Sequence, residues 1–188
     1  MKTLIITAHP SSKGFTHQIA KTYKKAKESL GVKVELMNLY DKKWKQDFLE
    51  FENMREITMD KTSQEIQKKI KESQEIIFVA PLWWTDVPAI MKNFIDINFS
   101  SGFAFKYDKK GKQHPLLKDK KARIFMTCDA PSWIYKILLS PTKMLWKIWR
   151  LGFCGIKLES FKLFGEKNKQ SEEQLQKYLK EVEAIAKK

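Results

Sequence analysis

The sequence contains few of the side chains that bind metals or form disulfides. Two cysteines, Cys128 and Cys154, and three histidines occur among its 188 residues. The cysteines do not form a C-x-x-C pair, and no group of cysteines and histidines has the spacing of a zinc site. We therefore expect no metal centre, and we expect two reduced thiols in the core of a cytoplasmic protein.

Long hydrophobic runs are missing as well. No apolar stretch approaches the roughly 20 residues of a membrane-spanning helix, so membrane contact is not expected. The amino-terminal segment MKTLIITAHP has a short apolar run and lacks the cleavage site of a signal peptide, and we expect a first strand there. A length of 188 residues, with 43% hydrophobic and 31% charged residues, predicts one soluble domain over residues 1–188.

Arginine is scarce in a chain that is strongly basic. The net charge is +14, but only Arg55, Arg123 and Arg150 are arginines, and the lysines are scattered along the chain. Proteins that read nucleic acids favour arginine, because its planar group binds bases and phosphates with two hydrogen bonds at once. We therefore expect no nucleic-acid partner, and a basic surface that attracts anionic ligands such as phosphorylated dinucleotides.

Apolar runs that are typical of strands alternate with helical patterns along the chain. Strands are predicted at residues 2–8, 32–38, 75–80, 122–128 and 155–164, and helices at 14–30, 61–73, 87–99 and 171–188. This alternation predicts an α/β fold with a doubly wound parallel sheet. Ser171 and Gln174 form a capping box for the last helix. The Gly- and Lys-rich residues 100–121 suggest an excursion outside the sheet, and Pro141 excludes one unbroken helix over 131–152.

The loop AHPSSKGFTHQ, which follows the first strand, has the composition of a phosphate-binding loop. Ligands of doubly wound sheets bind beyond the carboxyl ends of the strands, where this loop is expected to lie. Ser11 and Thr16 supply hydroxyl groups, Lys13 supplies charge, and Gly14 allows close approach of the backbone. The free amides of the following helix suit a phosphate. In the alternative interpretation the loop only caps a helix, and His9 is structural.

Two adjacent tryptophans, Trp83 and Trp84, follow the third strand in the loop PLWWTDVP. Loops usually run over the surface, where two neighbouring indoles are unfavourable unless a flat apolar ligand covers them. This pattern predicts a flavin ring. The alternative is that both indoles pack in the core, although two consecutive side chains cannot easily point into one core. Thr85 and Asp86 are positioned to cap the next helix.

Taken together, three segments resemble the flavodoxin-like NAD(P)H:quinone oxidoreductases. AHPxxxGFT, PLWWxxxPAIMKxxID and GFAFKY occur here in the order and spacing of that family, and the likeness is strong up to about Tyr107. The resemblance implies a three-layer α/β/α sandwich with a five-stranded parallel sheet in the order 2-1-3-4-5. It also implies a homodimer that oxidises NAD(P)H and reduces quinones in a ping-pong, two-electron scheme. We expect FMN as the cofactor, with FAD as the alternative, because the chain is short.

The resemblance also implies roles for individual residues. His9, Gly14, Phe15 and Thr16 would hold the flavin phosphate and ribityl chain. The backbone from Pro81 to Trp84 would surround the ring. The full expected flavin site is His9, Ser11, Lys13, Gly14, Phe15, Thr16, Pro81, Leu82, Trp83, Trp84, Thr127 and Asp129. No acid or base stands out, and His9 and Tyr107 are the candidates for stabilising charge.

Phe105 and Tyr107 resemble family residues that border the nicotinamide and quinone pocket, often from the partner subunit. Alternatively, they only anchor an aromatic loop. The loop after the fourth strand, TCDAPSW, departs from the family's Thr-Thr-Gly-Gly turn, so a substrate pocket of different shape is expected, with Trp133 and Tyr135 as its roof.

Two other functions fit the same fold. One is a flavin-binding regulatory subunit of a membrane transporter, and the other is a one-electron carrier of the flavodoxin type. The aromatic and basic segment Trp133–Arg150 could lie on a membrane surface, but a dimer or core face with a basic rim is the preferred interpretation.

Overall fold

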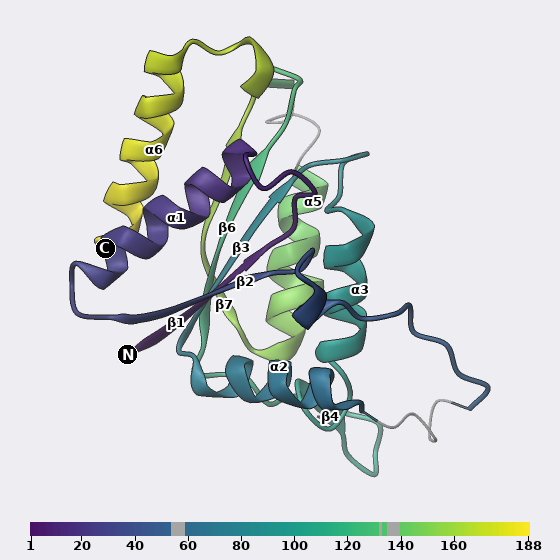
Figure 1. The fold of residues 1–188 in the computed structure, drawn as a ribbon. Helices are drawn as coiled ribbons and strands as arrows, with labels where there is room; N and C mark the ends of the chain where they lie inside the picture. The colour runs from purple at the N-terminus through teal and green to yellow at the C-terminus, as the bar shows by residue number, and fades with distance from the viewer. Residues whose placement is uncertain (54–58, 132, 135–139) are drawn as a thin grey trace.

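The computed structural model describes residues 1–53, 59–131, 133–134 and 140–188 (Figure 1). Five strands form one parallel sheet in the order β2-β1-β3-β6-β7. Their bounds are β1 Lys2–Thr7, β2 Lys33–Asn38, β3 Glu75–Pro81, β6 Lys121–Thr127 and β7 Lys157–Phe164. When only the strands of this sheet are counted, the order is the predicted 2-1-3-4-5. The central strand β3 is buried along its whole length, as its continuous apolar run predicted.

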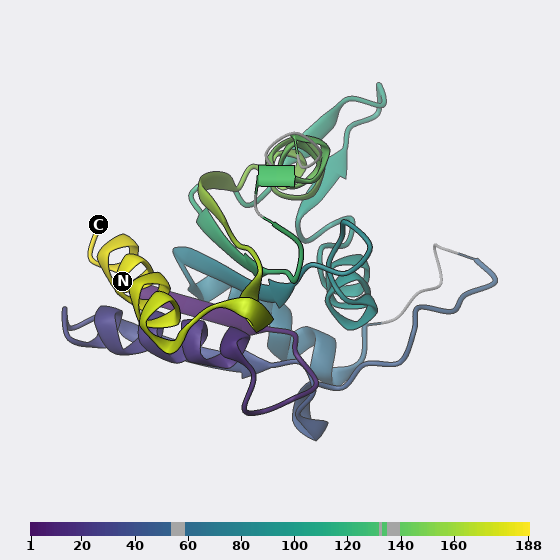
Figure 2. The same ribbon diagram turned by 90° about the horizontal axis from the view of Figure 1, so that it is seen from above.

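Helices cover both faces of the sheet (Figures 1 and 2). α1 and α6 pack together on one face, and α2 and α3 lie on the other with the helical segment of residues 140–151. The helices are α1 Phe15–Glu28, η1 Lys42–Trp44, α2 Lys61–Glu72, α3 Ala89–Asn98, α5 Ser140–Met144, η3 Leu145–Leu151, η4 Gly152–Cys154, η5 Lys167–Lys169 and α6 Glu172–Ala186. Each face therefore has its own apolar core.

Local sequence signals explain where several helices begin. The Asp60 carboxylate accepts a hydrogen bond of 2.6 Å from the Ser63 amide and caps α2. The Ser171 hydroxyl accepts one of 3.2 Å from the Gln174 amide and caps α6, which confirms the first of the two bonds of the predicted capping box. The third helix starts two residues later than predicted, because Pro88 occupies its N-cap position.

The predicted excursion is a hairpin outside the main sheet. β4 Phe105–Tyr107 pairs with β5 Gln113–Pro115 in antiparallel orientation. The hairpin follows α3, which runs back from the carboxyl end of β3, so it lies at the amino edge of the sheet (Figure 1). Residues 140–151 form a short α-helix that continues as a π-helix, with Pro141 in its first turn. In the described residues, no helix is long and apolar enough to cross a membrane.

A buried charge network ties the elements together at the amino edge. One carboxylate oxygen of the fully buried Glu75 accepts a hydrogen bond from the Tyr23 hydroxyl (3.0 Å) and forms an ion pair with the Arg123 guanidinium (3.0 Å). Its other oxygen accepts from the Thr3 hydroxyl (2.9 Å) and lies 3.5 Å from the Lys27 ammonium. Burial lowers the pKa of Lys27, against the opposing effect of Glu75. The network joins β1, α1, β3 and β6.

Candidate functional site

The loop after β1 is held by close contact between His9 and Gly14. The Ser11 amide donates to His9 Nδ1 at 3.1 Å, and the Gly14 amide donates to the Ser11 carbonyl at 3.0 Å. A Cβ atom at Gly14 would lie 2.8 Å from two atoms of the His9 ring, so a larger residue here would displace that ring. His9 Nδ1 also lies 3.1 Å from the Ser11 carbonyl, so the His9 ring contacts both backbone groups of Ser11.

The start of α1 offers free backbone donors at the end of this loop. Gly14 precedes the helix with no side-chain cap, and the first turn carries no acidic residue. The first amides of a helix lack intrahelical acceptors and carry partial positive charge, which suits an anion. The buried Thr16 hydroxyl lies 3.4 Å from the Thr127 hydroxyl at the end of β6, so the first and third loops meet here.

The loop after β3 closes in a tight turn that exposes both tryptophans. The Trp83 amide donates to the Asp86 carbonyl at 2.8 Å, and the Asp86 amide donates back at 3.0 Å. Between them Trp84 and Thr85 have left-handed backbone angles (φ 50° and 63°), which are unfavourable for large side chains. Trp83 is 44% exposed and Trp84 is 99% exposed. The alternative in which both indoles pack in the core is therefore wrong.

Asp86 does not cap α3, which corrects the expectation from the sequence. Its carboxylate instead pairs with the Arg150 guanidinium through hydrogen bonds of 2.7 and 2.6 Å and accepts from the Val87 amide at 2.7 Å. Burial acts to raise the pKa of Asp86, but the hydrogen bonds from Arg150 and Val87 outweigh it and hold the pKa below its usual value. The Thr142 hydroxyl donates to the Thr85 carbonyl at 2.7 Å. Two contacts thus fix this turn to the helical segment of residues 140–151.

The loop after β6 is joined by its backbone to the residues that follow β7. The Cys128 amide donates to the Phe164 carbonyl at 3.0 Å, and the Lys167 amide donates to the Cys128 carbonyl at 3.0 Å. The Glu166 amide donates to the Ala130 carbonyl at 3.1 Å. Burial raises the pKa of the Cys128 thiol to about 11, so this group stays protonated at neutral pH.

These loops surround a small cavity of about 100 Å³ at the carboxyl edge of the sheet. Its lining consists of His9, Phe15, Thr16, Pro81, Leu82, Trp83, Thr127, Cys128, Asp129, Lys167 and Asn168. Eight of these residues belong to the site predicted from the sequence. Cys128, Lys167 and Asn168 were missed. The position of Lys167 and Asn168 after the last strand could have indicated them, because that loop ends at the same edge.

Other predicted site residues lie outside this lining, as far as the described residues define it. Ser11, Lys13, Gly14 and Trp84 flank the cavity within its first two loops. Phe105 and Tyr107 lie on the hairpin at the amino edge, where the Phe105 ring packs 4.9 Å from that of Phe153. Trp133 is exposed and absent from the lining, and Tyr135 falls outside the described residues.

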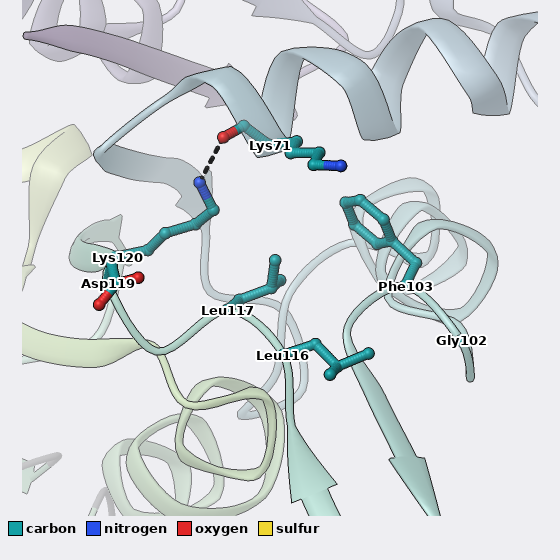
Figure 3. A pocket seen from close by; sticks show the side chains of 7 residues that line it. All are labelled: Lys71, Gly102, Phe103, Leu116, Leu117, Asp119 and Lys120. Carbon is teal, nitrogen blue, oxygen red and sulfur yellow. Dashed lines mark hydrogen bonds between the residues drawn. The ribbon is translucent and has the colours of Figure 1, made fainter.

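A larger cavity of about 370 Å³ lies at the opposite edge of the sheet (Figure 3). It is lined by Lys71, Gly102, Phe103, Leu116, Leu117, Asp119 and Lys120. The Lys120 ammonium donates to the carbonyls of Lys71 (2.7 Å) and Ser73 (2.6 Å), so it holds the carboxyl end of α2. Its charge therefore stabilises the helix end. The smaller cavity is the better candidate site, because ligands of parallel sheets bind at the carboxyl edge.

Comparison with known proteins places the chain in a family. The family described as having the flavodoxin-like fold matches residues 1–186. A protein of Haemophilus influenzae named "Uncharacterized NAD(P)H oxidoreductase" is 31% identical over 172 residues, which cover 88% of this chain and 84% of that protein. The FMN-dependent NADH:quinone oxidoreductase of Mycoplasmoides gallisepticum is 28% identical over 182 residues, which cover 92% of this chain and 91% of that protein.

A solved structure agrees with this assignment. Smu.1420 from Streptococcus mutans UA159 superposes with a TM-score of 0.85 and 28% sequence identity, over 100% of this chain and 99% of the other. Some further relatives are longer proteins, of which this chain spans 35% to 45%. The family match covers nearly the whole chain, the fold agrees, and the loops after β1, β3 and β6 meet at one edge of the sheet. This protein belongs to the family with the flavodoxin-like fold.

Proposed function

We propose that this protein is a flavin-dependent NAD(P)H oxidoreductase that transfers two electrons to quinones or similar acceptors, with FMN as its cofactor. The observation that carries the proposal is the convergence of the loops after β1, β3 and β6 on one cavity beside two exposed indoles. Relatives named as an NAD(P)H oxidoreductase and as an FMN-dependent NADH:quinone oxidoreductase support the same activity.

The residues of the site fit a flavin mononucleotide. The free amides at Phe15 and Thr16 suit its phosphate, and the backbone from Pro81 to Trp83 suits the edge of its ring. The enclosed volume of about 100 Å³ is smaller than the roughly 300–1,000 Å³ of typical ligand clefts. We therefore place the ring on the open rim, where Trp83 and Trp84 can cover it. Bound FMN would supply the hydride and electron transfer itself.

The chain's own residues position and shield this group. His9 uses Nδ1 to hold the first loop, so it orients the phosphate site. The Cys128 thiol lines the cavity but is protonated, because burial raises its pKa to about 11, and it is a poor nucleophile. The Arg150–Asp86 pair fixes the turn that carries both indoles. The protein therefore contributes binding and exclusion of water, and none of the described residues that line the cavity is assigned as an acid or base.

We also propose a homodimer, in which a second copy completes the acceptor pocket with Phe105 and Tyr107. Within one chain, these residues lie at the amino edge of the sheet, and the length of α3 separates them from the cavity at the carboxyl edge. Support for an interface comes from Ile148 and Trp149, two consecutive exposed apolar side chains on η3. Light scattering after size exclusion tests the dimer. Two buried free thiols support our placement of the protein in the cytoplasm.

The activity is tested by an absorption spectrum of the purified protein under anaerobic conditions. A flavin spectrum that bleaches with NADPH and returns with menadione supports the proposed oxidoreductase. A flavin that stays oxidised with NADPH contradicts it and favours an electron carrier or a regulatory subunit of a transporter. Failure to bind FMN or FAD would contradict the assignment of the cavity as well.

A further inference from the structure

We propose that Lys167 supplies the cation that binds the phosphate of the flavin cofactor, and that Lys13 in the first loop does not. This inference rests on the function proposed above and assigns one residue within that site. The sequence pointed to Lys13, because it lies in the phosphate-binding loop. In the structure, the cavity that contains His9, Phe15 and Thr16 is lined by Lys167, whereas Lys13 is exposed on the flank of the loop.

The backbone fixes the position of Lys167 beside the cavity. Glu166 adopts a left-handed conformation (φ 52°) and turns the chain at the end of β7. The Lys167 amide then donates to the Cys128 carbonyl at 3.0 Å, and the Glu166 amide donates to the Ala130 carbonyl at 3.1 Å. The short helix η5 starts at this point. Lys167 is thus held against the third loop, and it lines the same cavity as Phe15 and Thr16 at the start of α1.

The charge of Lys167 is available for a ligand. Among the residues that the structure describes, it forms no ion pair, and its ammonium donates to the neutral side-chain oxygen of Asn168 at 2.6 Å. An ammonium has three donors, so this bond leaves two for a phosphate. The same contact holds the side chain beside Asn168, which also lines the cavity.

The charges of the lining also favour a cation at this position. Asp129 and Lys167 are the only two formally charged residues of the described lining when His9 is neutral. Without Lys167, the remaining charge would be a carboxylate, which repels a phosphate. The amides at the start of α1 add partial positive charge, equivalent to about half an elementary charge, which also stabilises an anion. The positive charge of Lys167 offsets the negative charge of Asp129 in the cavity lining.

Comparing two ligands isolates this contact. FMN and riboflavin share the ring and the ribityl chain, and only FMN has the phosphate. Dissociation constants of both are measured by quenching of flavin fluorescence on flavin-free protein, for the natural chain and for Lys167→Gln. We expect the variant to weaken FMN binding by roughly tenfold to a hundredfold, the usual effect of losing a charged hydrogen bond. Riboflavin affinity should stay within about twofold.

Matched controls come from neighbouring lysines. Lys169→Gln removes the same charge from the same short helix, and Lys13→Gln removes the charge of the first loop; both should leave FMN affinity within about twofold. Lys167→Arg should retain most of the FMN affinity, which also shows that the site tolerates substitution. The FMN affinity of the natural chain should fall with salt more steeply than that of Lys167→Gln, because one ionic contact is lost.

Three results would overturn the assignment: equal weakening of FMN and riboflavin by Lys167→Gln, unchanged FMN affinity in that variant, or a selective loss of FMN affinity in Lys13→Gln. A natural chain that binds neither flavin would instead overturn the proposed function, and this inference with it. The two failures are therefore distinguishable in a single set of titrations.

Discussion

The guanidinium of Arg150 and the carboxylate of Asp86 form a two-point ion pair, with N–O distances of 2.7 and 2.6 Å. Arg150 also lies over the ring of the fully buried Trp146, 5.0 Å from its centroid. The π-helix η3 therefore supports the turn that presents Trp83 and Trp84. The geometry of the proposed flavin site therefore depends on Arg150, which lies 64 positions after Asp86 in the chain.

Replacing Arg150 with methionine should loosen the turn at residues 83–86. Asp86 would lose its ionic partner, and we expect a loss of about 1–2 kcal/mol in the free energy of unfolding. Fully buried pairs cost roughly 3–5 kcal/mol, but 38% of the Asp86 side chain is exposed and water can replace part of the bonding. Urea denaturation measures the loss. The exposed neighbour Lys147, changed to methionine, is the control; an equal midpoint for both variants would contradict this role.

The same pair predicts a specific loss of stability in acid. Because the pKa of Asp86 is lowered in the folded protein, its contribution is present above the unfolded value near 3.8 and is lost as pH falls through the lower folded value. The stability of the natural chain relative to Asp86→Asn should therefore be constant at neutral pH and shrink below about pH 4. Urea midpoints between pH 3 and 7 test this, and a difference that grows on acidification would refute it.

Trp84 is predicted to favour binding at the expense of folding. Its left-handed backbone is strained for a large residue, and its side chain is 99% exposed in the chain alone. Trp84→Gly should stabilise the flavin-free protein, by at most about 1 kcal/mol, because glycine adopts this conformation freely. The same change should weaken flavin binding severalfold through loss of stacking. The melting temperature of the flavin-free variant should therefore rise while its flavin affinity falls. A fall in both quantities would mean that the indole supports the fold.

Glu75 is expected to be essential for the fold and irrelevant to flavin contacts. Its removal would leave Arg123 and Lys27 buried with uncompensated charge, so Glu75→Ala should cost roughly 3–5 kcal/mol of unfolding free energy. Glu72→Gln removes an exposed partner of Lys2 and should leave the urea midpoint nearly unchanged. A small effect of Glu75→Ala would show that the network is dispensable.

The sequence predicted the sheet and most of the cavity, because both depend on local signals. Continuous apolar runs placed β1 and β3, and the composition of the first loop indicated His9, Phe15 and Thr16. The pairing of Asp86 with Arg150 was not predictable, because an aspartate just before a helix looks like a cap in sequence. Only the fold brings η3 against this turn.

Lys167 was missed for a related reason. It follows a strand whose loop lacked the aromatic or glycine-rich signal of the other three, and its role depends on the backbone bonds to Cys128 and Ala130. The hairpin of β4 and β5 was also predicted only as an excursion, because three-residue strands give too short a pattern to recognise.

The buried network around Glu75 lies at one edge of the sheet, and the ligand cavity lies at the other. A substitution in this network is therefore expected to disturb the fold at a distance from the residues that line the cavity. Changes in the loops at the carboxyl edge can alter the acceptor without threatening the fold. This separation offers a physical reason why the loops at the carboxyl edge can vary in sequence while the sheet is retained.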